Sequence, residues 1–158
     1  MHSRFSWLTV FICFLVAAIL EVMMLPAALQ PYRPEWLALV LIYWLLRHPE
    51  EIGMTCAVVF GLIMDVISGS AFGVHVSAYV ITSYLILNMH HRLKMFPIIQ
   101  QSVVIFILVA TQLMMVSLLG RMLVGTTSDL SYLWVALTSA LLWPLALICI
   151  DRLSFALR

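Results

Sequence analysis

Acidic side chains inside two apolar segments are the residues of this chain that could do chemistry. Asp65 lies near the end of the third apolar segment and Glu21 near the end of the first, while His75 begins the fourth. A carboxylate within a membrane span is costly, so it is a candidate proton or ion site, or a polar contact to a partner helix. Asp65 can instead be a structural partner of His75, or of Arg33 or Arg121 from neighbouring loops. We expect an outer polar cluster of Glu21, Arg33, Asp65 and His75, although Glu21 could instead reach headgroup water.

The chain lacks the residue patterns of common catalytic sites. It contains no Gly-x-Ser-x-Gly elbow, no Walker loop, no His-Glu-x-x-His and no paired intramembrane aspartate motif. Its three cysteines, Cys13, Cys56 and Cys149, lie in apolar segments without a Cys-x-x-Cys spacing, and we interpret them as apolar filling. We therefore predict no catalytic residue, no metal site and no cofactor.

Small side chains recur every four residues along the third apolar segment. Residues four apart lie on one ridge of a helix, and in lipid a ridge of small residues lets a second helix approach closely. Asp65 lies on the same ridge, so its side chain should face protein. We predict that this surface is a helix-packing or partner interface, made by Gly53, Ala57, Gly61, Asp65 and Gly69, with Gly73 following in the turn.

The composition indicates an all-α integral membrane protein. Of the 158 residues, 65% are hydrophobic and 9% are charged, whereas soluble proteins have about 25% charged residues. The mean hydropathy is +1.13, and the apolar runs lack the period of two that barrel strands need. A net charge of +1 gives no indication of nucleic-acid binding. No linker divides the chain, so we expect a single membrane domain over residues 1–158.

Apolar segments separated by Pro, Gly and charged residues predict a bundle of six short or tilted transmembrane helices. The second segment is short, because a helix over 34–47 would rise only about 21 Å against a hydrocarbon core of roughly 30 Å. A re-entrant hairpin is the alternative, but its tip would bury Arg47, His48, Glu50 and Glu51. We therefore expect a short full crossing helped by bilayer thinning or snorkelling. The predicted spans are about 7–29, 34–47, 52–67, 74–89, 98–120 and 132–150.

The positions of lysine and arginine favour an orientation with both termini in the cytoplasm. With the N-terminus inside, six of the eight Lys and Arg residues fall on the cytoplasmic side, and only Arg33 and Arg121 fall outside. Tyr43 and Trp44 would then anchor the second span at the inner interface, and Trp36 would anchor it at the outer interface.

Three runs, taken in order, resemble the motifs of one known family. The run from Tyr32 to Trp36 reads Tyr-Arg-Pro-Glu-Trp and leads into a Leu-rich span, like that family's Arg-Pro-x-Trp entry to its second span. The run from Gly61 to Gly73 contains the Gly-x-x-x-Asp-x-x-x-Gly signature, and a Leu-Trp-Pro run ending at Pro144 matches the last span. The chain thus resembles the family of the rod shape-determining protein MreD, with motif positions at Arg33, Pro34, Trp36, Asp65, Gly69 and Gly73.

This resemblance implies a multi-pass protein of the bacterial inner membrane. Members of the family are partners of MreC, a bitopic protein with a periplasmic domain. Together with MreB, RodA and a class B penicillin-binding protein, they direct peptidoglycan synthesis for rod growth. The resemblance also implies a fold similar to the S-components of energy-coupling-factor transporters.

Two functions are therefore compatible with the sequence. The first is a non-catalytic membrane scaffold that binds an MreC-like protein through helix contacts within the lipid. The alternative is a small-solute-binding membrane subunit of a transporter. That function would need a pocket lined by convergent polar groups such as Glu21, Asp65, His75 and Thr82.

Overall fold

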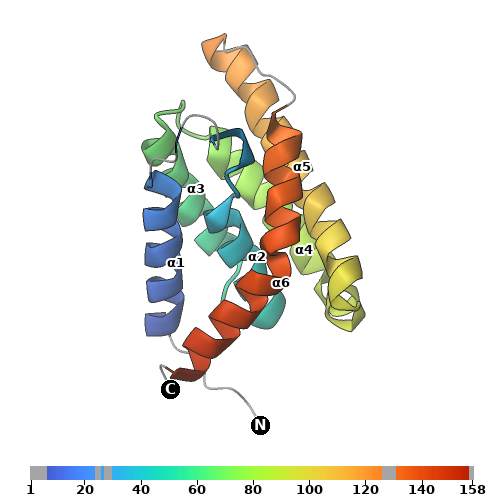
Figure 1. Cartoon of the computed structure of the whole chain (residues 1–158). Helices are drawn as coiled ribbons and strands as arrows, with labels where there is room; N and C mark the ends of the chain where they lie inside the picture. Colours follow the sequence, from blue (N-terminus) through green and yellow to red (C-terminus); the bar gives the residue numbers. More distant parts are fainter. Residues whose placement is uncertain (1–6, 24–25, 27–29, 126–130, 157–158) are drawn as a thin grey trace.

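The computed structural model describes residues 7–23, 26, 30–125 and 131–156, and these residues form helices without any β-strand (Figure 1). Successive helices run in alternate directions along one bundle, so α1 begins and α6 ends at the same end of the molecule (Figure 1). This arrangement confirms the all-α prediction. In chain order the elements are α1 (Trp7–Val22), the short 3-10 helix η1 (Gln30–Tyr32), α2 (Trp36–Arg47), α3 (Met54–Ser68), α4 (Val74–Met95), α5 (Ile98–Val124) and α6 (Tyr132–Ala156).

The helix ends differ from the predicted spans for local reasons. α1 ends at Val22, and residues 24–25 and 27–29 of the predicted span lie outside the described residues. Pro26 has no backbone N–H that could donate to the carbonyl of Val22, four residues earlier. α4 continues past residue 89 to Met95, since the basic residues of its last turns are good helix formers, and Pro97 follows its end. α6 likewise continues past residue 150 to Ala156.

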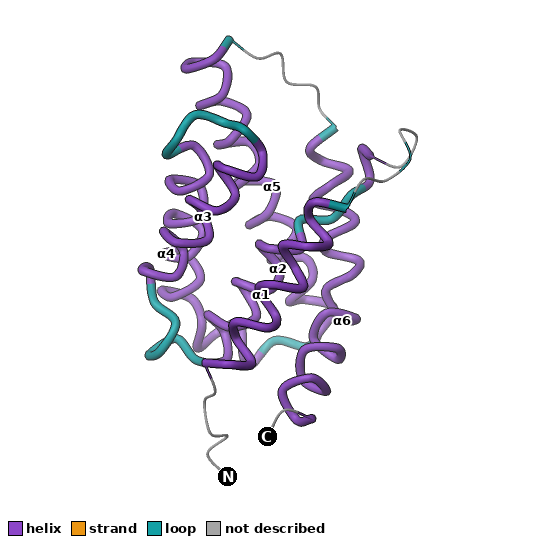
Figure 2. The backbone as a smooth tube through the Cα atoms, turned by 90° about the vertical axis from the view of Figure 1, so that its left-hand side faces the viewer, coloured by secondary structure: helices purple, strands orange, loops and turns teal. Residues whose placement is uncertain are grey.

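α2 is the central helix of the bundle. Ten consecutive residues, Leu37 to Leu46, are buried, and a helix that is apolar all round is one that protein surrounds. α2 contacts α1, α4 and α6, and Figure 2 shows α1 in front of it with α4 and α6 on opposite sides. Because protein covers α2, its short length does not have to match the lipid. The expected short full crossing by this helix stays a prediction.

The aromatic residues of α2 lie differently from the predicted anchors. Tyr43 and Trp44 are 4% and 2% exposed, so their rings pack inside the bundle and do not face outward. Trp36 is half-buried at the other end of the helix. Tyr and Trp side chains are typical of membrane interfaces. Because α2 is central, however, Tyr43 and Trp44 have protein neighbours.

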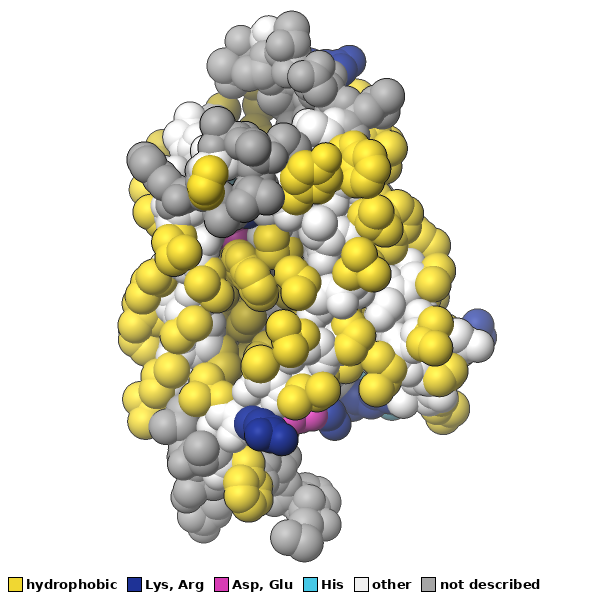
Figure 3. Space-filling model, viewed as in Figure 1, with side chains coloured by type: hydrophobic (Ala, Val, Ile, Leu, Met, Phe, Trp, Pro, Cys, Tyr) yellow, Lys and Arg dark blue, Asp and Glu magenta, His cyan; other side chains and the backbone are white. Residues whose placement is uncertain are grey.

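The outer surface of the bundle is apolar. Large hydrophobic side chains are exposed on helices around the bundle, among them Phe11, Val66, Ile107 and Leu141, and Figure 3 shows them spread over most of one face. Soluble monomers rarely expose contiguous apolar patches of more than a few hundred Å². Two helices, Ile98–Leu123 and Tyr132–Phe155, are long and apolar enough to cross a membrane, and α1, α2 and α3 are shorter apolar helices. The six predicted crossings stay a prediction.

The ridge of small residues on α3 packs against α4. Ala57 and Gly61 are buried, and a Cβ atom added at Gly61 would lie 2.5 Å from the Cα of Val76. Real Cβ atoms do not approach a backbone this closely, so only glycine permits the contact. Gly53 lies at the start of α3, and nothing lies within 4 Å of its ideal Cβ position. The middle of the ridge is therefore used inside the molecule.

We predict that Gly61→Ala destabilises the protein although alanine is the better helix former. The added methyl group must push apart the α3 and α4 backbones, and overpacking of this kind costs about 1–3 kcal/mol. Gly53→Ala makes the same chemical change where space is open, and it should cost less than about 1 kcal/mol. Denaturant unfolding of the purified protein in mild detergent measures both changes. Equal stability of the two variants would contradict the close packing.

Candidate functional site

Asp65 closes the turn between α3 and α4. Its Oδ2 accepts a hydrogen bond from the backbone N–H of Gly73 at 2.7 Å, and its Oδ1 accepts one from the backbone N–H of His75 at 2.8 Å. The Ser70 hydroxyl donates to the same Oδ1 at 2.9 Å, and the His75 Nδ1 lies 2.9 Å from it. A carboxylate at a helix N-terminus satisfies backbone donors that have no partner within the helix. Asp65 therefore caps α4 from the preceding helix.

Two glycines of the same turn have left-handed backbone conformations. Gly69 ends α3 with φ +63°, and the N–H of Ser70 donates to the carbonyl of Asp65 at 3.1 Å, as in a Schellman motif. Gly73 precedes α4 with φ +101°. A side chain at either position would be strained. The residues from Gly61 to Gly73 thus form the turn between two packed helices. Gly61 permits close packing, Asp65 caps α4, and Gly69 and Gly73 let the chain reverse its direction.

Glu21 of α1 joins the first helix to the start of α2. Its Oε2 accepts a hydrogen bond from the backbone N–H of Trp36 at 3.1 Å. Its Oε1 lies 3.3 Å from Nη2 of Arg33, and the two groups form an ion pair. Glu21 is buried and Arg33 is half-buried. The alternative that Glu21 reaches headgroup water does not fit, because its carboxylate is buried and bonded within the chain.

The predicted outer polar cluster is therefore two separate pairs. Glu21 pairs with Arg33, and Asp65 pairs with His75. Among the described residues, no hydrogen bond or ion pair joins one pair to the other. Each pair ties together elements adjacent in the chain, α1 to α2 and α3 to α4.

Glu35 is the buried acid that sequence reasoning did not single out. It lies immediately before α2 and is 6% exposed. Its Oε2 accepts hydrogen bonds from the Tyr79 hydroxyl of α4 at 3.2 Å and from the Gln112 Nε2 of α5 at 3.3 Å. Its backbone N–H donates to the Ser139 hydroxyl of α6 at 3.0 Å. Glu35 thus links α2 to three other helices, and its place between proline and an apolar run was the signal that could have found it.

A third polar group lies at the opposite end of α2. The Tyr43 hydroxyl donates to Asp151 of α6, and Nη2 of Arg47 lies 2.9 Å from Oδ2 of the same carboxylate. The Arg47 guanidinium carbon also lies 5.7 Å from the centre of the Tyr43 ring. Asp151 follows the last predicted span, so its part in the bundle was not predicted. Both ends of the central helix are therefore fixed by polar contacts.

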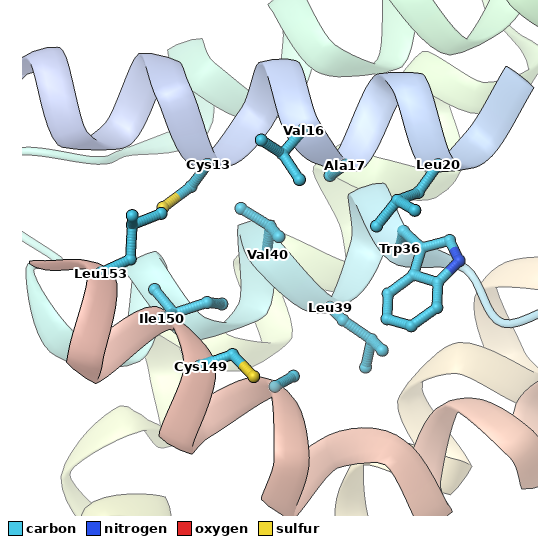
Figure 4. Close-up of a pocket in the computed structure, with 11 residues that line it drawn as sticks. Cys13, Val16, Ala17, Leu20, Trp36, Leu39, Val40, Cys149, Ile150 and Leu153 are labelled. Carbon is cyan, nitrogen blue, oxygen red and sulfur yellow. The ribbon is translucent and has the colours of Figure 1, made fainter. Parts of the chain in front are cut away.

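An apolar groove lies between α1 and α6, with α2 as its floor (Figure 4). Its volume is about 140 Å³, and its lining is almost wholly apolar. Small residues contribute to both walls, Cys13 and Ala17 from α1 and Ala146 and Cys149 from α6. None of Glu21, Asp65, His75 and Thr82 lines this groove. Within the described residues, no three His, Cys, Asp or Glu side chains are grouped to hold a metal ion.

Comparisons with known proteins identify relatives along almost the whole chain. A family model described as rod shape-determining protein MreD matches residues 1–151. The curated rod shape-determining protein MreD of Haemophilus influenzae (strain ATCC 51907 / DSM 11121 / KW20 / Rd) is 30% identical over 146 residues, which are 91% of this chain and 90% of that relative. No solved structure matches the chain significantly. The expected similarity to transporter S-components therefore stays a prediction.

Replacing Asp65 tests its role as a cap. Asp65→Ala removes the acceptor of two backbone N–H groups and should lower the free energy of unfolding by about 1–3 kcal/mol. Asp65→Asn keeps one carbonyl oxygen, so its loss should be smaller. Unfolding in mild detergent gives both values. If Asp65→Ala is as stable as the parent but does not support rod growth, the carboxylate has a functional role instead.

Replacing Glu35 tests the link between α2 and its neighbours. Glu35→Ala leaves the Tyr79 hydroxyl and the Gln112 amide without their acceptor, which should cost about 1–3 kcal/mol. Glu50→Ala removes the same side chain from an exposed turn and should change stability by less than about 0.5 kcal/mol. In a double-mutant cycle, Tyr79→Phe should cost less in the Glu35→Ala background than in the parent. Strict additivity would contradict this contact.

Proposed function

This chain belongs to the family of the rod shape-determining protein MreD, and we propose that it is a non-catalytic, multi-pass membrane scaffold of the bacterial rod complex. In this proposal its direct partner is an MreC-like membrane protein. Through that partner it helps to direct peptidoglycan synthesis together with MreB, RodA and a class B penicillin-binding protein. The chain crosses the inner membrane six times and has both termini in the cytoplasm.

The internal use of buried carboxylates is the observation that supports a scaffold most directly. Glu21, Glu35 and Asp65 each accept hydrogen bonds from another helix or turn of the same chain. A proton or solute carrier needs acidic groups that meet a substrate, whereas these groups hold helices together. The polar chemistry of the interior is thus structural, and interaction is left to the outer surface.

The alternate directions of the helices support the proposed orientation. The end of α2, the junction of α4 with α5 and the end of α6 lie together at one end of the bundle (Figure 1). These are the segments that contain Arg47, Arg92, Lys94 and Arg152. Cationic residues concentrate on the cytoplasmic side of membrane proteins. This end is accordingly the cytoplasmic end in our proposal.

The groove between α1 and α6 is the proposed docking surface for the single transmembrane helix of an MreC-like partner. The groove is apolar, as a lipid-embedded contact requires, and small residues on both walls would let a helix backbone approach closely. A partner helix has no access to the α3 ridge at Gly61, because α4 already packs against this residue. The solute-binding alternative has less support, since Glu21, Asp65 and His75 are engaged within the chain.

We predict that Val16→Trp weakens capture of the MreC-like partner and Leu15→Trp does not. Both side chains are about half exposed on α1, but only Val16 lines the groove. A bulky ring in the groove should cost at least about 1.4 kcal/mol of binding, a tenfold loss. Co-purification from membranes in mild detergent measures the captured fraction, and cell shape in a complemented strain is the second readout.

Cys149→Trp tests the opposite wall of the groove in the same way. Its control on α6 is Leu141→Trp, at an exposed position outside the groove. Normal partner capture by both groove variants would mean that lipid, not a partner helix, covers this surface. Equal losses in all four variants would indicate a general effect of added bulk.

A further inference from the structure

A cavity of about 540 Å³ opens at the proposed cytoplasmic end of the bundle. It lies between the end of α2, the junction of α4 with α5, and α6. Figure 1 shows α6 changing direction along its length, so that its last turns lie away from α5. Pro144 is inside this helix and lines the cavity, and an internal proline removes a backbone hydrogen bond and bends a helix. The bend thus leaves the space that the cavity occupies.

One part of the cavity wall is cationic. Arg47 and Lys94 line it, against the single carboxylate of Asp151. The Arg47 guanidinium is held in place by Asp151 and by the face of the Tyr43 ring. Lys94 is exposed and has no ion pair among the described residues. Figure 3 shows basic and acidic side chains at the lower end of the face. Two cationic groups against one carboxylate allow this part of the cavity wall to attract an anion.

Another part of the wall is apolar and continues onto the outer surface, and His48, Gln101 and Tyr43 also line the cavity. Leu46 and Leu147 lie inside, while Ile98 and Ile148 line the cavity and are also more than half exposed. An anion such as free phosphate would gain nothing from these side chains. A ligand with a charged head and hydrocarbon chains would contact both parts of the wall at once.

Hydrogen bonds of Gln101, which lines the cavity, join the helices around it. The Gln101 Nε2 donates to the carbonyls of Leu93 at 2.9 Å and Phe96 at 3.2 Å, and its Oε1 accepts a bond from Trp143 Nε1 at 3.3 Å. One side chain of α5 therefore fixes the end of α4 and the bent part of α6. A preformed site of this kind binds with a smaller entropic loss.

We propose that this cavity binds an anionic phospholipid of the cytoplasmic leaflet. The headgroup phosphate lies between Arg47 and Lys94, and the acyl chains run along Ile98 and Ile148 toward the bilayer. Basic pockets between transmembrane helices on the cytoplasmic side suit anionic headgroups. An acidic peptide would use the cationic part alone, so the apolar wall favours the lipid. The inference depends on the proposed membrane orientation but not on the partner-binding groove.

The test compares one lysine, Lys94, with one arginine, Arg92, both in the last turn of α4. Lys94→Gln removes one of the two cationic groups, Arg47 and Lys94, that line the cavity, whereas Arg92→Gln removes an exposed charge of α4 that does not line it. Native mass spectrometry of the purified full chain in neutral detergent counts bound phosphatidylglycerol, with phosphatidylcholine of the same acyl chains as the zwitterionic control. We expect Lys94→Gln to weaken phosphatidylglycerol binding about fivefold more than Arg92→Gln does, with phosphatidylcholine binding weak throughout.

The apolar wall has its own matched pair. Ile148→Asn should weaken phosphatidylglycerol binding, whereas Leu145→Asn, which is equally exposed on α6 and lies outside the cavity, should not. Equal effects of Lys94→Gln and Arg92→Gln would overturn the proposal, because binding would then be diffuse. Full competition by inorganic phosphate, or a preference for an acidic peptide over the lipid, would overturn it as well. Lys94→Gln should leave partner capture unchanged, so the two proposals fail separately.

Discussion

The burial of α2 on every side is the constraint on which the rest of the structure depends. In a membrane, helices gain no hydrophobic free energy by meeting, so packing and hydrogen bonds must hold them in place. The ten buried apolar residues of α2 give close contact but little positional information. Polar contacts at both ends supply that information: Glu21 and Glu35 hold the start, and Asp151 holds Tyr43 and Arg47 at the end. The central helix is thereby fixed in depth and rotation.

The hairpin of α3 and α4 applies the same physical principle between neighbours in the chain. Gly61 lets the two backbones touch, and Asp65 satisfies the first N–H groups of α4. The Gly-x-x-x-Asp-x-x-x-Gly run, which resembles a motif of the MreD family, is thus explained by local geometry. An acidic residue within an apolar segment is a functional candidate by default, but here its donors are all groups of the turn and of α4. The chemistry of the motif is that of a stable helical hairpin.

α6 has two different surfaces, and its residues line both hollows of the molecule. Ala146, Cys149 and Ile150 face the groove beside α1, whereas Leu147 and Asp151 face the charged cavity. One hollow is apolar and the other is amphipathic, so they suit different ligands. In our proposals a partner helix occupies the first and a lipid headgroup the second.

The sequence by itself determined the elements and the contacts between adjacent ones. Apolar segments, prolines and the spacing of glycines predicted the helices, the turn at Gly69 and Gly73, and the pairing of Asp65 with His75 as one of its alternatives. These features depend on residues at most ten positions apart, which helix periodicity and turn geometry bring together. Only the tertiary structure decided which helix is central and which faces are exposed. In a chain that is apolar on nearly every face, hydrophobicity does not distinguish protein from lipid, so the contact of Tyr43 with Asp151, 108 residues away, follows from helix arrangement alone.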